Sequence, residues 1–120
     1  SPIAPNIYTK DVIKKLNIPL LVVTTPSENS VNSTLLTINT ANESGIKVRG
    51  VIVNNIKKDC DKIMLTSVTR LIEEYTDTKV LGLLENLGNN PQPEDLITSI
   101  LNGIDIESVF NIKIEKLDFA

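Results

Sequence analysis

The 120-residue sequence contains no histidine, no tryptophan and a single cysteine, and aromatic side chains make up only 3% of it. Without histidine, a Cys/His zinc site and every Ser-His or Cys-His nucleophile arrangement within this chain are excluded. The lone Cys60 cannot form an intramolecular disulfide. Such cysteine usage favours a reducing, cytoplasmic compartment.

Glycine-rich phosphate-binding motifs are also missing. The five glycines are scattered, and neither G-x-x-x-x-G-K-[ST] nor G-x-G-x-x-G occurs. We therefore expect that no loop of this chain wraps a triphosphate in backbone amides, and that the chain alone does not bind ATP tightly.

Charge and hydropathy exclude two further classes of partner. The net charge is −3, and the basic pairs Lys14-Lys15 and Lys57-Lys58 are isolated, whereas nucleic-acid binding requires a basic patch or stripe. The longest apolar run, from Ile18 to Val23, is far too short to span a bilayer. We expect neither a nucleic acid nor a membrane as partner.

Three apolar stretches have the length and β-branched content of strands: Leu20–Thr25, Val48–Asn54 and Lys79–Leu84. The first and last are nearly continuous, which is typical of parallel strands buried on both faces. Since helical stretches separate them, we expect right-handed βαβ crossovers. The predicted fold class is α/β, a single domain over residues 1–120 with a parallel sheet flanked by helices in three layers, Rossmann-like or P-loop NTPase-like.

The helices are predicted from apolar spacing and from capping residues. Two short helices, Thr9–Leu16 and Asp105–Phe110, precede and follow the strands, and a tail covers Asn111–Ala120. Three longer helices present these apolar stripes: Val31, Leu35, Leu36 and Ile38, capped by Ser30 or Asn29 and stopped by Gly45; Met64, Val68, Leu71, Ile72 and Tyr75, capped by Asp59 or Asp61; and Leu96, Ile97, Ile100 and Leu101, between Pro93 and Gly103.

Two features predict a partial domain. Three strands make a small sheet for this class, and the opening residues Ser1–Pro5 have neither helix-start nor strand character. We therefore expect that an N-terminal part was removed or lies on another chain.

Ligands of open α/β sheets bind beyond the carboxyl ends of the strands. The first such loop leads to a helix start, where the amides of Ser30, Val31 and Asn32 are predicted to be unpaired and to suit a carboxylate or phosphate. The alternative is that Ser30 and Asn29 only cap the helix.

The other two strand ends carry amide and acidic side chains. In the pair Asn54-Asn55 a side-chain amide can present a paired donor and acceptor to a heterocycle such as adenine, although asparagine is also an ordinary turn residue. Glu85, in the loop Glu85-Asn86-Leu87-Gly88, is a candidate base or metal ligand, or a solvated loop acid.

Several segments together resemble the dethiobiotin synthetase family. Leu20-Leu21-Val22-Val23 and, after a polar loop, Val31–Thr37 resemble that family's "V-V … I-N-H-x-L-L-T" segment. The other matching segments are Gly45–Asn54 for "G-x-x-x-x-G-x-x-x-N", Val80–Leu84 for "v-l-G-x-l-P", and Pro2-Ile3 with Asp11–Leu16 for "V-P-[IL] … D-l-i-k-x-l". The resemblance covers nearly the whole chain in unbroken order.

The resemblance implies an ATP- and Mg²⁺-dependent ligase that makes dethiobiotin from 7,8-diaminononanoate and carbon dioxide, in biotin biosynthesis, as a homodimer. It implies that Asn54 reads adenine, that Glu85, Asn86 and Leu87 line the base pocket, and that Ser30, Val31 and Asn32 hold the substrate carboxylate. The phosphate loop and catalytic lysine of the family lie N-terminal to the matching segments. No catalytic residue or metal ligand is therefore assigned to this chain, and ATP and Mg²⁺ are expected to be bound mainly by the N-terminal half.

The sequence departs from the family at three points. Val31-Asn32-Ser33 replaces I-N-H, Glu85 replaces the usual proline, and Ser27-Glu28-Asn29 lacks the usual small glycine. Two alternative functions remain open at this stage. One is a non-catalytic, regulatory module of the same fold, as fused to some phosphate acetyltransferases, and the other is an amidotransferase synthase of the cobyrinate type.

Overall fold

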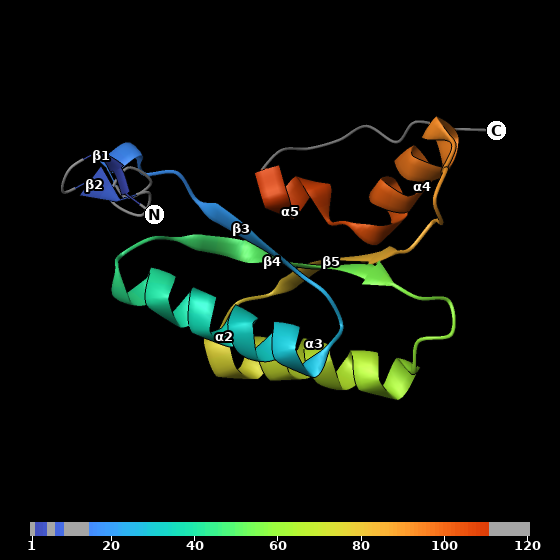
Figure 1. The fold of residues 1–120 in the computed structure, drawn as a ribbon, viewed down its shortest axis with the longest axis horizontal. Helices are drawn as coiled ribbons and strands as arrows, with labels where there is room; N and C mark the ends of the chain where they lie inside the picture. The colour runs from blue at the N-terminus through green and yellow to red at the C-terminus, as the bar shows by residue number, and fades with distance from the viewer. Residues whose placement is uncertain (1, 5–6, 9–14, 111–120) are drawn as a thin grey trace.

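The computed structural model describes residues 2–4, 7–8 and 15–110, in which a three-stranded parallel sheet lies between two layers of helices (Figure 1). The strand order is β3-β4-β5. The elements are β1 (Pro2–Ala4), β2 (Ile7–Tyr8), β3 (Leu20–Thr24), α2 (Glu28–Glu43), β4 (Val48–Ile56), α3 (Lys62–Thr76), β5 (Val80–Glu85), α4 (Pro93–Gly103) and α5 (Ile106–Phe110). The predicted three-layer α/β fold is confirmed.

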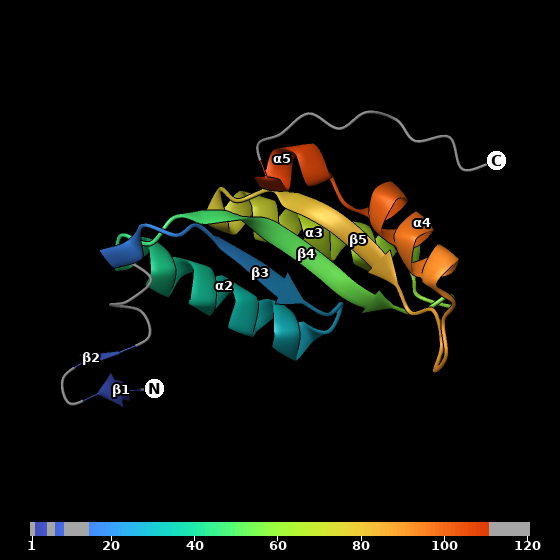
Figure 2. The same cartoon turned by 90° about the horizontal axis from the view of Figure 1, so that it is seen from above.

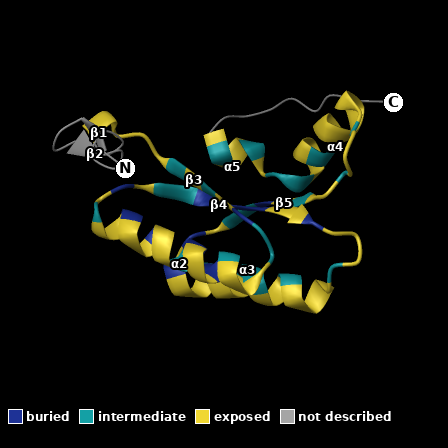
Figure 3. Cartoon of the chain, viewed as in Figure 1, coloured by how far each residue is buried: buried dark blue, intermediate teal, exposed yellow. Residues whose placement is uncertain are grey.

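The core lies between β4 and the helix pair α2 and α3. Val51 and Val53 of β4, Ile38 of α2 and Ile72 of α3 are fully buried. The burial is visible in Figure 3, where β4 is the darkest strand and the outer faces of α2 and α3 are exposed. Burying a branched aliphatic side chain contributes roughly 1.5–3 kcal/mol, so this cluster is the main source of the fold's stability.

The opposite face is covered at β5 by α4 and α5 (Figure 1). The chain between these helices runs antiparallel to β5, with Gly82 bridged to Ile104 and the Asp105 amide donating to the Leu81 carbonyl at 2.7 Å. A Cβ on Gly82 would lie 2.8 Å from Cγ1 of Ile104. A glycine at this position therefore allows the close approach of the two segments.

The β3 strand is less covered than its composition predicts. Leu21 and Val23 are 37% and 60% exposed, because α2 packs on only one face of β3 and α4 and α5 lie over β5. In β5, Leu83 is 41% exposed as well. The prediction that the first and last strands are buried on both faces is therefore wrong, whereas the middle of β4 meets this description.

Parts of the predicted apolar stripes are also exposed. Leu36 (69%) and Tyr75 (71%) point away from the core, and Met64 and Leu71 are exposed as well. In α4 no residue is buried. Helical spacing identified the helices correctly but overestimated how much of each apolar stripe this chain covers.

The helix ends follow capping chemistry. Asp61, one of two predicted candidates, caps α3 by accepting from the Ile63 amide at 2.9 Å. Gly45 adopts a positive φ of 74° directly after the α2 cap, as a helix stop requires. The N-cap of α2 is Ser27, so the prediction of Ser30 or Asn29 is wrong.

At the C-terminal side Asp105 accepts from the Ser108 hydroxyl at 2.6 Å and from the Ser108 amide at 3.1 Å. These hydrogen bonds lower the pKa of Asp105. The predicted helix at 105–110 is confirmed as α5, whereas the tail at 111–120 lies outside the described residues.

At the N-terminal side β1 and β2 pair antiparallel, with Pro2 opposite Tyr8. The prediction that the opening residues have no strand character is therefore wrong. Of the predicted helix Thr9–Leu16, only Lys15 and Leu16 are described, and both are helical.

A buried hydroxyl pair joins the tip of β3 to α2. Thr34 Oγ1 donates to Thr24 Oγ1 at 2.7 Å and also lies 2.7 Å from the carbonyl oxygen of Ser30, while Thr24 and Thr34 are 6% and 4% exposed. The pair therefore joins the end of β3 to the first turns of α2.

None of the helices within the described ranges has the length and apolar character needed to cross a membrane.

We expect Thr34→Val to lower the free energy of unfolding by about 1–2 kcal/mol, because the Thr24 hydroxyl keeps only longer contacts, to the Ser30 carbonyl at 3.3 Å and the Thr25 carbonyl at 3.5 Å. The double variant Thr24→Val/Thr34→Val should cost less than the sum of the single changes, since it removes both hydroxyls of one bond. Urea denaturation measures these differences, with exposed Thr40→Val as the control. Additive single effects would contradict a direct coupling.

We expect Asp61→Ala to lower the free energy of unfolding by about 1 kcal/mol, because α3 loses its N-cap hydrogen bond. Asp59→Ala removes a carboxylate of the same type two residues earlier and should change stability by less than about 0.5 kcal/mol. Thermal or urea unfolding of both variants decides between the two aspartates. Equal losses of stability in the two variants would show that the change in net charge, rather than the loss of the N-cap, lowers the free energy of unfolding.

Candidate functional site

Polar side chains gather at the carboxyl ends of the three parallel strands. A groove of about 450 Å³ lies beside β3, and a cavity of about 500 Å³ lies between the ends of β4 and β5 and helix α4. Asn54 lines both of them. The single Asn54 side chain, at the end of the central strand, therefore separates two possible ligand positions.

The groove beside β3 is lined by hydroxyl and amide groups and carries no charged side chain. Ser30 Oγ lies 2.8 Å from Ser27 Oγ and 2.7 Å from Thr25 Oγ1. Its full lining is Val22, Val23, Thr24, Thr25, Asn29, Ser30, Ser33, Thr34, Thr37 and Asn54. Such a wall offers hydrogen bonds to a polar ligand without charge selection.

The hydrogen bonds at the start of α2 differ from the prediction that the amides of Ser30, Val31 and Asn32 are unpaired. The Ser30 amide donates to Ser27 Oγ at 3.2 Å, and the Val31 amide donates to the Ser27 carbonyl at 2.9 Å. In a helix that begins at Glu28, the amides without an intrahelical or capping partner are those of Glu28 and Asn29. The premise that the Ser30 and Val31 amides are unpaired is therefore wrong, and Val31 is 3% exposed within the core. Asn32 is exposed on α2, outside the lining of the groove.

The cavity between β4, β5 and α4 brings together all four residues predicted for the base pocket. Asn54, Glu85, Asn86 and Leu87 line it. Its other lining residues are Asn55, Leu84, Gly88, Pro91, Leu96, Ser99 and Ile100. Apolar walls with a few amide groups suit a flat, weakly polar heterocycle.

Within this cavity the asparagines differ in availability. Asn86 Nδ2 donates to Asn55 Oδ1 at 2.8 Å, and Asn86 Oδ1 accepts from the Gly88 amide at 2.8 Å. Asn55 itself adopts a left-handed φ of 59°, a conformation that asparagine tolerates better than most residues. The Asn86 side chain thus fastens the β5–α4 loop to the end of β4, while Asn54 is exposed and can turn its amide towards a ligand.

A third cavity, of about 670 Å³, also has Glu85 in its lining. It is lined by Lys58, Glu85 and Asp95 together with hydroxyl groups of α4. In the part of the chain that the structure describes, no three acidic, cysteine or histidine side chains come together as metal ligands. Glu85 therefore has a basic as well as an acidic residue in the same lining.

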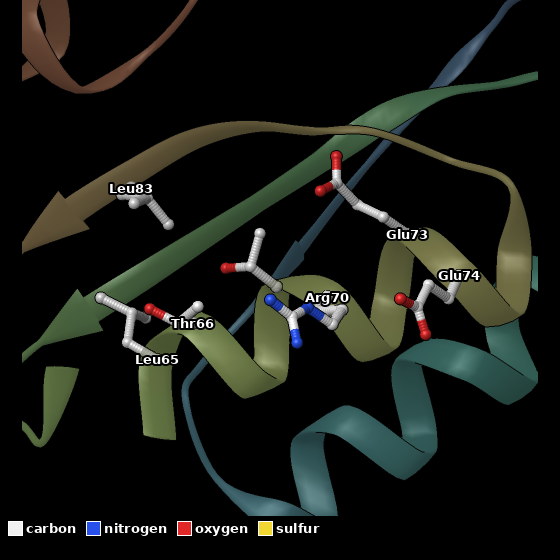
Figure 4. A pocket seen from close by; sticks show the side chains of 7 residues that line it. Leu65, Thr66, Arg70, Glu73, Glu74 and Leu83 are labelled. Carbon is white, nitrogen blue, oxygen red and sulfur yellow. The ribbon is translucent and has the colours of Figure 1, made fainter. Parts of the chain in front are cut away.

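A cavity of about 430 Å³ lies apart from the strand ends, between α3 and β5 (Figure 4). Its side chains include Leu65, Arg70 and Leu83, and Glu73 points from α3 towards β5. There the Glu73 carboxylate accepts from the Val80 amide at 3.2 Å. Glu73 therefore has a structural role at the start of β5.

Sequence reasoning missed several lining residues. Thr25, Ser33 and Thr37 of the groove come from a strand end and from one face of α2. The i, i+4 spacing of Ser33 and Thr37 could have placed both residues on one face of α2. Small hydroxyl residues are, however, common on exposed helix faces, so the spacing alone does not indicate a groove. Asn55 stands beside Asn54 at the predicted strand end, but the sequence does not reveal that its side chain accepts a hydrogen bond from Asn86, 31 residues away.

Comparison with known proteins finds one family model and several relatives of similar sequence. Residues 1–93 match the family model AAA_26, described as "AAA domain". The chain is 35% identical over 97 residues to the ATP-dependent dethiobiotin synthetase of Bacillus cereus (strain B4264), covering 77% of this chain and 40% of that protein. The enzyme of the same name from Bacillus velezensis is 29% identical over 111 residues, covering 92% of this chain and 47% of the relative.

A relative from a third organism carries the same name. The ATP-dependent dethiobiotin synthetase of Nitrosopumilus maritimus is 31% identical over 104 residues, which cover 87% of this chain and 42% of that enzyme. The chain thus spans less than half the length of these relatives. The family match over 93 residues, the parallel α/β fold and the relatives agree: the chain belongs to the dethiobiotin synthetase family of AAA domains.

Proposed function

We propose that this chain supplies the base side and the substrate side of an ATP-dependent ligase that forms dethiobiotin from 7,8-diaminononanoate and carbon dioxide. One observation carries the proposal: Asn54, Glu85, Asn86 and Leu87, chosen on sequence resemblance, line one cavity at the carboxyl end of the sheet. This is the place where open α/β sheets bind ligands.

In this proposal the adenine of ATP lies in the cavity between β4, β5 and α4. Leu84, Leu87 and Ile100 provide apolar contact to the ring, and the Asn54 amide pairs with its polar edge. The Asn86 side chain holds the loop, because its Nδ2 donates to Asn55 and its Oδ1 accepts from the Gly88 amide. Bound ATP would supply the phosphoryl group that activates the carboxylated substrate.

The substrate carboxylate is proposed to lie at the end of the groove, by Ser30. The Ser30 and Thr25 hydroxyls lie 2.7 Å apart there, and the amides of Glu28 and Asn29 begin α2 beside them. An anion is favoured at this position by the helix dipole and by the free amides. Val31 and Asn32 then act by fixing the helix rather than by direct contact.

The phosphate loop, the Mg²⁺ site and the catalytic groups are assigned to a companion half, corresponding to the part of the relatives that this chain does not match. No G-x-x-x-x-G-K-[ST] motif occurs in this sequence, and the relatives named above are more than twice as long as their matched parts. The complete enzyme is proposed to act as a cytoplasmic homodimer, as the family resemblance implies.

We expect the isolated chain to bind ATP more weakly than about 1 mM by titration calorimetry, because it lacks the phosphate-binding amides. Adding the part of the Bacillus cereus enzyme that this chain does not match should restore binding. Binding in the micromolar range by the chain alone would refute the division of the site between two halves.

In the completed enzyme, Asn54→Ala should raise the Kd for ATP about 10- to 100-fold. The reason is that the bound adenine would lose one or two hydrogen bonds to its polar edge inside the cavity. The matched control is Asn42→Ala, which removes the same group from an exposed position of α2. Calorimetry or nucleotide competition measures both variants. An unchanged Kd for Asn54→Ala would show that the adenine base does not bind in this cavity.

A further inference from the structure

The cavity of about 430 Å³ between α3 and β5 forms a groove that none of the proposed ligand contacts uses (Figure 4). Its lining is Leu65, Thr66, Thr69, Arg70, Glu73, Glu74 and Leu83. Leu83 of β5 lies across the groove from α3 and is nevertheless exposed. In the part of the chain that the structure describes, α3 therefore leaves an apolar strip of β5 uncovered, with charged side chains along the helix.

The C-terminal segment of this chain starts beside the groove. The Asp105 amide, directly before α5, donates to the Leu81 carbonyl at 2.7 Å, and the Glu73 carboxylate accepts from the neighbouring Val80 amide at 3.2 Å. Figure 2 accordingly shows α5 at the start of β5, and Figure 1 shows α3 on the opposite face of the sheet. The described chain ends with α5, so residues 111–120 start near the Glu73 end of the groove.

The sequence of residues 111–120 suits an apolar groove with a charged rim. Ile112 and Ile114 alternate with Lys113 and Glu115. This period of two places both isoleucines on one side of an extended segment and both charges on the other. The segment also contains one of the two phenylalanines of the chain. Such a segment gains free energy when its apolar side is buried and its charged side stays in solvent.

The length and the order of charges match the groove as well. Glu74 and Leu65 lie about 13 Å apart along α3, at the rise of a helix, whereas ten extended residues reach about 33 Å. The exposed Glu74 and Arg70 are separated by about 6 Å along the helix, and Lys113 and Glu115 by about 7 Å in an extended segment. A segment that enters from α5 would bring Lys113 to Glu74 first. Glu115 would then reach Arg70.

We propose that residues 111–120 of this chain dock as an extended segment in the groove between α3 and β5. Ile112 and Ile114 pack against Leu83 and cover its exposed side chain. The occupant is the chain's own segment because a covalent link at the mouth of the groove gives it an effective concentration on the order of millimolar. The family match ends at residue 93, and the inference does not rest on the proposed function.

Disulfide trapping in the full chain tests the position of the segment. In a Cys60→Ser background, Thr69→Cys with Ile114→Cys should form an intramolecular disulfide under oxidised glutathione, because a disulfide requires Cβ atoms that lie close together. The control pair is Ser67→Cys with Ile114→Cys, since Ser67 is exposed on α3 outside the groove lining. The Thr69 pair should form its disulfide at least about tenfold faster, as measured by mass spectrometry.

Charge reversal tests the direction in which the segment runs. Added to the trapping pair, Arg70→Glu should slow disulfide formation about threefold or more, because it places a like charge beside Glu115. The further change Glu115→Arg should restore the rate. Lys62→Glu changes the net charge of α3 equally at an exposed position outside the groove lining, and it should leave the rate unchanged.

Proteolysis provides a measurement that needs no introduced cysteine. Trypsin cleaves after Lys113 and Lys116, and docking should protect both bonds, since cleavage follows the population of the open form. Leu83→Gln should speed cleavage at these bonds at least about fivefold, because the groove loses its apolar contact. Leu36→Gln changes an exposed leucine of α2 outside the groove lining and should leave cleavage at the wild-type rate.

Three results would overturn the docked segment. These are equal trapping at Thr69 and Ser67, an effect of Arg70→Glu that Glu115→Arg does not reverse, and a cleavage rate that Leu83→Gln leaves unchanged. Disulfides that join two molecules and increase with protein concentration would assign the groove to the segment of a second copy.

Discussion

The structure depends on the pairing of β4 with a strand on each side. Val51 and Val53 of β4 are fully buried, and the β3 and β5 ladders hold the strand in register along this stretch. The buried strand ends in exposed Asn54 and Asn55. A rigid, buried strand thus carries the amide groups to the edge of the sheet, so the position of the candidate site follows from core packing.

Two local devices then organise the loops around that strand end. The Thr24–Thr34 hydrogen bond fixes the start of α2 on one side, and the Asn55–Asn86 hydrogen bond fixes the β5–α4 loop on the other. Neither device needs a ligand. Both walls of the site are therefore preorganised by polar side chains of this chain, which reduces the ordering cost of binding.

The sequence predicted the strands and helices well because local spacing and caps determine them. It located Asn54 and the Glu85–Leu87 segment at strand ends, and the structure brings them into one cavity. It failed where the outcome depends on tertiary contacts. Spacing does not reveal that Leu21, Val23 and Tyr75 are left exposed, and serine-rich composition does not reveal that Ser27 rather than Ser30 caps α2.

The covered β5 edge also limits self-association. A sheet with two bare edges can grow without end, as in fibrils, because each added molecule presents a new edge. With Ile104 and Glu73 bonded along one side, two molecules that met through β3 would present, in the part of the chain that the structure describes, only the covered β5 edges to a third. The short segment between α4 and α5 therefore occupies backbone groups of β5 with which a strand of another molecule would otherwise pair.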